Sequence, residues 1–501
     1  MSLSITGNRT LLTSKSATTV GLAAAAAVAA ATLLFLTLSN EGEGEGKSNK
    51  LKKKALPRTK MGILETIRMM AGATVPFDLL DIAHDLGSYV FELNLPIPGH
   101  PKTVVVADPE DVRSILKDPM TDKPRALYGR LAEMVPSKEP SLFAMQSSGI
   151  EGQEWHRRRK GAMPAFSPRH VRRMNEVAYE HATLWCDGKL ASFASQDLPF
   201  DVVDEMMRLI LRAFCDTALE YHISDQDMDM FLEEWHLASK EYFLKSTTNP
   251  FRKYFQMFLP DRRRAQEAVL NILGLLQRII DNYRSLDEPV EGTVINRIMT
   301  NPTFKDDHQL KSELFAFIVA GSDTTAISLS WILSELAKNP DEQKRLRDAL
   351  QPLERDEWSS NDVLRKVVNE GLRIHPVGAA NLARQIGRDY VTARDSYYLP
   401  KGTVAFLPIY LVHRNHHTFD DPDLFRPSRW DNPTEKVKNG LMPFAAGKQN
   451  CVGQSLANAE LHCILAQVIK DYEFSIHQEG SGEHDLVLKP VGLRMKVKRI
   501  L

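Results

Sequence analysis

Residues 444–453 have the sequence FAAGKQNCVG and place one cysteine, Cys451, between the glycines Gly447 and Gly453. A buried structural cysteine usually has apolar neighbours, and a disulfide needs a second cysteine. Cys451 instead lies in a glycine-containing loop just before SLANAELHCILAQVI, a run with a helical pattern. This setting predicts a sulfur that a large group must approach closely.

The chain of 501 residues has only three other cysteines, Cys186, Cys215 and Cys463, and it has no CxxC pair or close Cys/His cluster. These spacings do not indicate a zinc site or a disulfide scaffold, and they favour a reducing compartment. We expect the three cysteines to be small buried apolar side chains. Hydrophobic residues make up 43% of the chain and charged residues 25%, which is typical of a globular protein with a large core. The net charge of -1 gives no indication of nucleic-acid binding.

The N-terminal segment differs in composition from the remainder of the chain. No charged residue occurs between Lys15 and Glu41, and VGLAAAAAVAAATLLFLTL within this stretch is about long enough to cross a bilayer. We therefore predict a hydrophobic membrane anchor over residues 1–40, followed by a charged flexible linker over 41–60 that includes a basic cluster at 52–54. The basic cluster would keep the following domain in the cytosol. The alternative is an organelle transit peptide, because the residues before Glu41 are rich in Ser and Thr and lack acids.

From residue 61 onward the pattern predicts one large domain that is mainly α with a small β portion. No internal repeat and no second linker divides it. Amphipathic helical runs lie near residues 170–193, 203–221, 262–285, 308–338, 361–373 and 454–471. Strand patterns are short, and they comprise YVFELNL, KTVVVA, GTVAFLPIY and the final LRMKVKRI.

A polar group interrupts the longest apolar helical run, LFAFIVAGSDTTAISLSWILSEL. It contains Gly321, Asp323 and Thr324. An acid is costly to bury in such a helix, and a threonine there can donate to a carbonyl one turn earlier. A solvated kink is the plain alternative. Because the flanking residues are apolar almost all round, the pattern favours a functional polar notch in an apolar wall.

Several charged or aromatic residues indicate a function only when their order along the chain is considered. Glu370 and Arg373 are three apart and share a helix face, and Arg429 lies in a proline-bounded loop ahead of the cysteine loop. Trp155 and Arg159, in EWHRRRK, are four apart and could together bind a carboxylate. Taken singly, each is as easily explained as a surface ion pair or a core tryptophan.

Trp155/Arg159, AGSDTT, Glu370-x-x-Arg373, the Arg429 loop and FxxGxxxCxG occur in this order. In this ordered set the chain resembles the cytochrome P450 family of haem-thiolate monooxygenases, of the membrane-anchored eukaryotic type. The resemblance covers roughly residues 60–501. It is most specific in the cysteine loop and in the helix that carries the acid and threonine.

The resemblance implies that haem b (iron-protoporphyrin IX) is the cofactor and that Cys451 is the thiolate ligand of its iron. Gly447 and Gly453 would allow a tight loop close to the porphyrin, and Phe444 would pack beside the sulfur. Backbone N–H groups directed at the sulfur would tune its donor strength. On this interpretation the cysteine lacks a protein partner because its partner is iron.

The same resemblance implies two further groups of residues around the haem. Asp323 and Thr324 would be catalytic on the face opposite the sulfur, where Thr324 would hold a water and Asp323 would connect it to the bulk proton supply. Trp155, Arg159 and Arg384 would bind the haem propionates.

Glu370, Arg373 and Arg429 are implied to be structural and to brace the cysteine loop from behind. One position departs from the family pattern, because Gln449 stands where an arginine usually pairs with a propionate. Glutamine can donate a hydrogen bond but supplies no charge. We expect the adjacent Lys448 to compensate.

The implied activity is insertion of one atom of dioxygen into an apolar substrate of lipid, sterol or terpenoid type. Electrons would come from NADPH through a separate flavoprotein reductase, or from a cytochrome b5-type donor, because no flavin or iron–sulfur motif occurs in the chain. The implied location is the endoplasmic reticulum membrane, or a plastid or mitochondrion under the transit-peptide alternative. The expected substrate wall comprises Phe315, Phe317, Val319 and the stretch after Pro376. The expected basic face for the reductase comprises Arg157, Arg158, Lys160 and Lys448.

Three other classes of function remain open at this point. A haem-thiolate isomerase or lyase could act on a peroxide without activating oxygen, although the intact pair of Asp323 and Thr324 argues against it. A haem-binding sensor would show no turnover. A helical membrane scaffold without haem would require the order of the motifs to be a coincidence.

Overall fold

The computed structural model describes residues 54–97, 99–246 and 249–500. The predicted anchor over 1–40 and the linker up to residue 53 lie outside these described residues. Lys54 and Arg58, from the end of the predicted linker, form isolated bridges with Tyr397 and Glu92. The compact unit accordingly begins at Lys54 and continues to Leu501.

The domain is mainly helical, as predicted, and six of its described helices coincide with the amphipathic runs of the sequence. These helices are α7 (Pro168–Trp185), α9 (Val202–Ala218), α12 (Pro260–Ser285), α14 (Asp307–Lys338), α16 (Asp362–Ile374) and α19 (Gln454–Asp471). Other helices that matter for the site are α5 (Arg125–Tyr128), α6 (Gly149–Ala162) and α10 (Asp225–Ser239).

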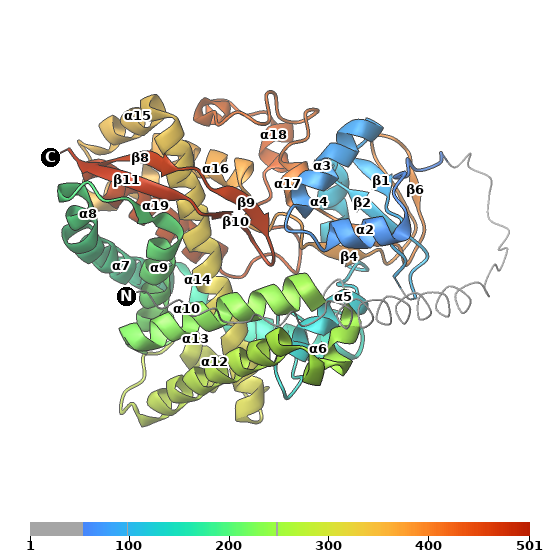
Figure 1. The fold of residues 1–501 in the computed structure, drawn as a ribbon, viewed down its shortest axis with the longest axis horizontal. Helices are drawn as coiled ribbons and strands as arrows, with labels where there is room; N and C mark the ends of the chain where they lie inside the picture. The colour runs from blue at the N-terminus through green and yellow to red at the C-terminus, as the bar shows by residue number, and fades with distance from the viewer. Residues whose placement is uncertain (1–53, 98, 247–248, 501) are drawn as a thin grey trace, which may run out of the picture. The chain divides into compact units, whose positions relative to one another are not determined.

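Helix α14 runs through the middle of the domain (Figure 1). It begins after Asp306, whose side chain accepts from the backbone N–H groups of His308 and Gln309. The helix is continuous across residues 321–325, and Asp323 and Thr325 are buried within it, so the polar residues do not form the solvated kink given as the alternative. Among the described helices α14 alone is long and apolar enough to cross a membrane. However, 78% of its apolar stretch is buried inside the domain. Its composition therefore reflects a position in the core.

The apolar core falls into three clusters of buried side chains, and α14 contributes to all of them. Ile327 and Trp331 face the cluster around the larger sheet, and Phe317 faces the cluster formed with α10 and α12. Leu329 and Ile332 face the cluster formed with α16 and α19. A helix that is apolar on all sides is expected at such a shared position.

The β portion consists of short strands, again as predicted. The larger sheet has the order β1-β2-β7-β4, formed by β1 (Val90–Glu92), β2 (Thr103–Val106), β7 (Val404–Phe406) and β4 (Ala383–Gln385). Strands β2 and β7 are parallel, and β4 runs antiparallel to β7 with Arg384 opposite Ala405. A second sheet has the order β3-β11-β8, formed by β3 (Phe200–Asp201), β11 (Arg494–Arg499) and β8 (Tyr472–Gln478).

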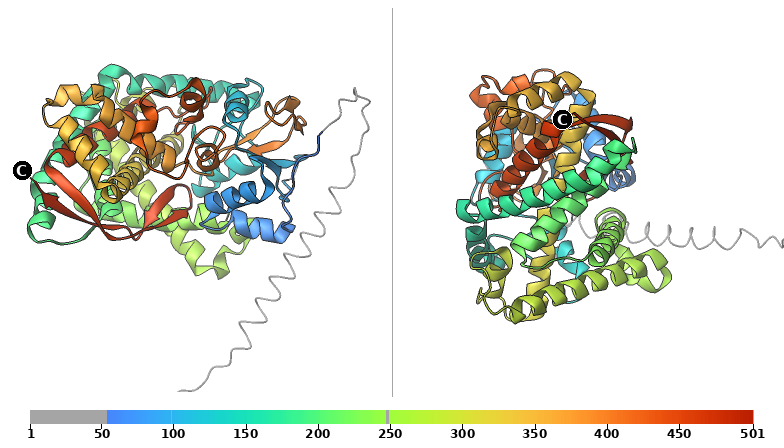
Figure 2. Two further views of the ribbon diagram at one scale, coloured as in Figure 1. Left: turned by 90° about the horizontal axis from the view of Figure 1, so that it is seen from above. Right: turned by 90° about the vertical axis from the view of Figure 1, so that its left-hand side faces the viewer.

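These two sheets lie at opposite ends of the domain (Figures 1 and 2). Between them the hairpin of β9 (Ser481–His484) and β10 (Leu488–Val491) packs against α14, where Trp331 donates to the Leu488 carbonyl at 2.9 Å. A second two-stranded pair, β5 (Tyr390–Val391) and β6 (Tyr398–Leu399), follows β4 in the chain.

Candidate functional site

The cysteine loop has a backbone that only particular residues accommodate. Gly447 has a φ of +75°, and a Cβ atom there would lie 2.0 Å from the carbonyl oxygen of Leu116, so glycine is required. Ala445 also has a positive φ, of +58°. The backbone N–H of Cys451 donates to the Phe444 carbonyl at 3.0 Å, which closes the loop.

Gly453 ends the loop and is the N-cap of α19. A Cβ atom there would lie 3.7 Å from the Phe166 ring, which is an ordinary contact, and its φ of -88° is accessible to any residue. The described protein therefore gives no steric reason for glycine at 453. Its backbone N–H does act on the cysteine, because it lowers the pKa of the Cys451 thiol.

Cys451 opens on a cavity of about 330 Å³ inside the domain. Burial raises the pKa of its thiol, while the Gly453 N–H and the charge of Arg159 lower it. Thr324 on α14 lines the same cavity, as do Trp155 and Arg159 on α6. Residues separated by about 300 positions in the sequence thus surround one space.

Only some of the residues predicted to form the substrate wall line this cavity. Phe317 lines the cavity, together with Val377, Gly378 and Leu382 from the stretch after Pro376. The predictions for Phe315 and Val319 are wrong, because neither residue is among those that line it. Helical rotation explains the difference, since Phe315 points toward α10 and its ring centroid lies 5.7 Å from that of Trp235.

Arg159 lies directly beside the cysteine loop. It donates from Nη1 to the Asn450 carbonyl at 3.0 Å and from Nη2 to the Asn450 side chain at 2.6 Å. Its guanidinium carbon is 5.6 Å from the centroid of the buried Trp155 ring. Within the described chain it forms no ion pair with a carboxylate, so its charge is available to an anion in the cavity.

Arg384 and Lys448 are less directly placed. Arg384 is buried in β4, where Nη1 donates to the Ala383 carbonyl at 2.8 Å, and it is not among the residues that line the cavity. Lys448 donates to the Pro119 carbonyl at 3.0 Å and does not line the cavity either. Gln449 does line the cavity, but its amide donates to Asp122 Oδ1 at 2.7 Å. The expectation that Lys448 compensates for Gln449 therefore finds no support in its position.

Asp323 and Thr324 point to different sides of α14. Thr324 Oγ1 donates to the Ala320 carbonyl at 2.9 Å and faces the cavity, and this back-bonding is the type predicted from the sequence. Asp323 is 5% exposed and faces α10, where Trp235 Nε1 donates to its Oδ2 at 2.6 Å. Its Oδ1 is buried without a hydrogen-bond partner among the described residues. Burial raises the pKa of Asp323 to about 7, although the Trp235 hydrogen bond lowers it.

A second buried acid, Glu460 on α19, lines the cavity and was not predicted. Burial raises its pKa to about 8, and a hydrogen bond with Thr325 partly offsets this. Its Oε2 has no hydrogen-bond partner within the described structure. The sequence did contain an indication, because Glu460 is the one acid inside the run SLANAELHCILAQVI.

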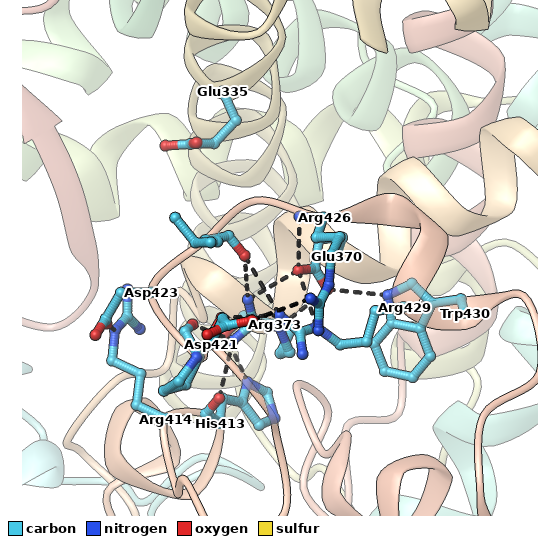
Figure 3. Close-up of polar contacts among 12 residues, drawn as sticks. Glu335, Glu370, Arg373, His413, Arg414, Asp421, Asp423, Arg426, Arg429 and Trp430 are labelled. Carbon is cyan, nitrogen blue, oxygen red and sulfur yellow. Dashed lines mark hydrogen bonds and ion pairs between the residues drawn. The ribbon is translucent and has the colours of Figure 1, made fainter.

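The carboxylate of Glu370 is fully buried and surrounded by donors (Figure 3). Arg373 donates to both of its oxygens, at 2.9 Å and 2.8 Å, and Arg429 donates to Oε1 at 3.2 Å. The backbone N–H of Arg426 and the indole of Trp430 each add a hydrogen bond at 3.0 Å. The structure therefore brings together the three predicted residues, and Trp430 is an additional member that the sequence reasoning missed.

His413 connects this network to the cysteine loop. Arg373 Nη1 donates to its carbonyl at 3.0 Å, and its Nδ1 contacts the Arg373 carbonyl at 3.1 Å. The backbone N–H of Met442, two residues before Phe444, donates to His413 Nε2 at 2.9 Å, so the ring proton is on Nδ1. Burial and the Arg373 charge lower the pKa of His413 to about 3, which keeps the ring neutral.

The predicted basic face requires one correction. Arg157 and Lys160 are exposed on α6. Arg158 is 2% exposed and pairs with Glu154 and, at 3.1 Å, with Glu313, so it is wrong as a surface contact. Adjacent residues of a helix are rotated by about 100° from each other, so Arg158 lies away from the face that Arg157 and Lys160, three positions apart, share.

Comparison with known proteins places these observations in a family. The family model described as Cytochrome P450 matches residues 94–499. Human "Cytochrome P450 4F12" is 34% identical over 198 residues, which is 37% of this chain and 37% of the relative. "Cytochrome P450 4d8" of Drosophila melanogaster is 26% identical over 64% of this chain and 77% of the relative. "Taurochenodeoxycholic 6 alpha-hydroxylase" of Sus scrofa is 24% identical over 65% of this chain and 69% of the relative. The matched region spans only 37% to 39% of the length of human relatives such as 4F12, 4F2 and 4F8.

Proposed function

The chain belongs to the cytochrome P450 family, and from that premise we propose that it is a haem-thiolate monooxygenase that inserts one atom of dioxygen into an apolar substrate. Proteins of this family bind haem b through a cysteine thiolate. The observation that carries the proposal is the single cavity lined by Cys451, Thr324, Trp155 and Arg159.

The residues around the cavity fit a haem. Cys451 is free and accessible from the cavity, and Arg159 has no carboxylate partner in the described chain. Gly447 and the hydrogen bond from Cys451 to Phe444 fix the loop that presents the sulfur. When bound, a thiolate-ligated haem supplies the redox chemistry that activates dioxygen for cleavage of its O–O bond.

Thr324 and Asp323 would have different roles in proton transfer. Thr324 Oγ1 faces the cavity and would hold a water or the reacting oxygen group. Asp323, with a pKa of about 7, exchanges protons readily at neutral pH, and a change of its side-chain rotamer or a bridging water would carry the proton to Thr324. Trp235 holds Asp323 on the α10 side between transfers.

The network of Glu370, Arg373 and Arg429 would act on the reaction only through the cysteine loop. None of these three residues lines the cavity. Leu372 does, and it lies on α16, the helix that carries Glu370 and Arg373. The link through His413 to Met442 supports a bracing role, since it joins the network to the backbone that leads into Phe444. Arg384 would act together with Arg159 on the haem propionates.

The substrate is proposed to be an apolar molecule of lipid, sterol or terpenoid type. Phe166, Phe317, Val377 and Leu382 give the cavity an apolar wall. The pig relative is named a taurochenodeoxycholic 6 alpha-hydroxylase.

The electron donor is proposed to be an NADPH-dependent flavoprotein reductase, with a cytochrome b5-type donor as the alternative. The exposed Arg157 and Lys160 lie on the same helix as Arg159, which contacts the cysteine loop. Basic residues near the cofactor would steer an acidic partner, so reduction should slow as the ionic strength rises.

The location is proposed to be the endoplasmic reticulum membrane with the catalytic domain in the cytosol. Deletion of residues before 47 should release the protein from membranes without changing its absorption spectrum. Protease digestion of intact microsomes tests the orientation. A catalytic domain protected inside an organelle would support the plastid or mitochondrial alternative.

The proposal is tested by purifying the haem protein and measuring NADPH-dependent oxygen consumption with a reductase, while lipid, sterol and terpenoid substrates are screened by spectral shift. Substrate-stimulated oxygen consumption with hydroxylated product is the expected result. Peroxide rearrangement without NADPH would identify an isomerase or lyase. Haem binding without any turnover would identify a sensor.

A further inference from the structure

We propose that Glu313 determines substrate specificity by accepting a hydrogen bond from a hydroxyl group on an otherwise apolar molecule. Glu313 lies on α14 and lines the same cavity as Cys451 and Thr324. This role rests on the proposed function for the reaction itself and narrows it to substrates that carry a hydroxyl group.

Glu313 belongs to the face of α14 that borders the cavity. Residues of this face recur at the spacing of three and four that a helix repeats, and they include Glu313, Ala316, Phe317, Ala320 and Thr324. Phe317, one turn from Glu313, is part of the apolar wall. A rise of about 1.5 Å per residue separates Glu313 from Thr324 by about 16 Å along the helix axis. The carboxylate therefore borders the apolar part of the cavity, away from the residue proposed to hold the reacting oxygen group.

The two oxygens of the Glu313 carboxylate differ in their partners. Oε2 accepts from the backbone N–H of Leu142 at 3.0 Å and from Nη1 of Arg158 at 3.1 Å. Oε1 makes no hydrogen bond with any described residue. Because Glu313 is 1% exposed and lines the cavity, the space beside Oε1 is the cavity itself. A buried polar oxygen without a partner is costly, so a donor on the substrate would stabilise the complex.

The charges around Glu313 favour a neutral donor. The buried Arg158 lies between Glu313 and Glu154 and pairs with both carboxylates. Lys123, a second buried cation on the cavity wall, interacts electrostatically with Glu313 and would repel an ammonium group. A substrate carboxylate would be repelled by Glu313 itself and has no hydrogen to donate. A hydroxyl group carries no charge and meets neither obstacle.

A hydroxyl group also suits both protonation states of Glu313. Burial raises the pKa of Glu313, whereas the charge of Arg158 and the Leu142 N–H lower it. A hydroxyl donates to the carboxylate and accepts from the protonated acid, while a ketone or an ether can only accept. Among the proposed substrate types, the site therefore favours sterols and other hydroxylated apolar molecules over free fatty acids.

The test measures the binding of paired probes to the haem-loaded protein by equilibrium dialysis. The probes are cholesterol and its methyl ether, hexadecanol and its methyl ether, hexadecanoic acid, and hexadecylamine. The parent should bind at least one alcohol about tenfold more tightly than its ether, because the ether cannot donate to Oε1. Equal binding of alcohol and ether in both pairs would overturn the proposal. Tighter binding of the acid or the amine than of either alcohol would overturn it in favour of a charged substrate.

The variants test whether Glu313 is the source of this preference. Glu313→Leu combined with Arg158→Met removes the pair without leaving a buried charge, and it should bind alcohol and ether within about twofold of each other. The control Glu154→Gln removes the other partner of Arg158, which does not line the cavity, and should keep the preference. A preference that survives in the double variant would overturn the proposal.

If the double variant does not fold, Glu313→Asp decides the question. It keeps the charge and withdraws the oxygens by one methylene, so the preference should shrink, and an unchanged preference would overturn the proposal. Product formation with a reductase is recorded separately. Turnover without any preference for the alcohol would contradict the role of Glu313 alone, whereas a preference without turnover would contradict the monooxygenase activity alone.

Discussion

Two groups of buried carboxylates lie within the same domain and differ in how fully they are partnered. Both oxygens of Glu370 accept hydrogen bonds, and its donors include Arg373, Arg429 and Trp430. Asp323 and Glu460 each have one buried oxygen that lacks a partner among the described residues. All three residues are less than 6% exposed, so burial alone does not distinguish them.

The difference separates a group that holds structure from groups that can move protons. A carboxylate fixed by several donors has one favoured geometry, and removing a single donor leaves a buried charge without that partner in a low-dielectric environment. A partly partnered acid in an apolar site has a raised pKa and can exchange a proton near neutral pH. Substitutions in the Glu370 network should therefore impair folding and haem retention. Substitutions around Asp323 should instead impair the reaction.

The largest effect is expected when the saturated network is broken. Glu370→Ala or Arg373→Ala should cost ~3–5 kcal/mol and yield protein with little haem, because one buried charge loses its partner. Haem content and urea unfolding measure this. The matched control is Arg365→Ala on the same helix, whose exposed pair with Asp362 should contribute less than ~1 kcal/mol. A soluble, haem-loaded, active Glu370→Ala protein would remove the distinction between the two groups.

On the α14 side, Thr324→Ala should leave folding and haem binding nearly intact. Proton delivery should become undirected, so NADPH oxidation continues while product falls and peroxide accumulates. The product-to-NADPH ratio should drop by about tenfold or more, given the effect of a positioned proton-transfer group. Ser330→Ala is the control, because Ser330 makes the same kind of back-bond, to the Ala326 carbonyl at 2.9 Å, but does not line the cavity. Unchanged coupling in Thr324→Ala would reopen the isomerase alternative.

A pH series sharpens the comparison further. The folded-state pKa of Asp323 is raised to about 7 and that of Glu460 to about 8, so the folded protein binds more protons than the unfolded chain between about pH 4 and these values. The free energy of unfolding should therefore fall as the pH rises through this window, by up to ~1.4 kcal/mol per pH unit for each group. Asp323→Asn or Glu460→Gln should each remove its share of the slope, as measured by urea unfolding from pH 5 to 8. An unchanged slope in both variants would mean that neither acid is protonated in the folded state.

The smallest effect is expected from Trp235→Phe, which removes one hydrogen bond to Asp323 and keeps an aromatic ring. Since that bond lowers the pKa of Asp323, its loss should raise the pKa and move the pH dependence of coupling upward. The change in stability should be about 1–2 kcal/mol. A loss of coupling at every pH, with no displacement of the profile, would indicate that Trp235 acts only in packing.

The sequence predicted the features that depend on local pattern. The six amphipathic runs became helices, and the glycine at 447 is required by a positive φ and by contact with Leu116. Glu370, Arg373 and Arg429 converge because two of them share a helix face and the third lies in a loop that packs against it. Their order along the chain carried the resemblance to the cytochrome P450 family, and that resemblance implied their bracing role.

Features that depend on long-range placement were missed or misplaced. Nothing local indicates that Lys123 is buried beside Arg384, because a bridge between residues 122 and 385 brings them together. The rotation of α14 decides that Phe317 and Thr324 face the cavity while Phe315 and Asp323 face α10. His413 has no motif around it, and its role depends on contacts to Arg373 and Met442.

The most direct test of the central claim is the absorption spectrum of Cys451→His after reduction and binding of carbon monoxide. The parent protein should show the red-shifted Soret band of a thiolate-ligated haem, since Cys451 lines the cavity with Thr324 and Arg159. Cys451→His should lose that red shift, whereas Cys463→Ser, which changes a buried cysteine on the following helix α19, should keep it. A red-shifted band that survives in Cys451→His would contradict the assignment of Cys451 as the iron ligand.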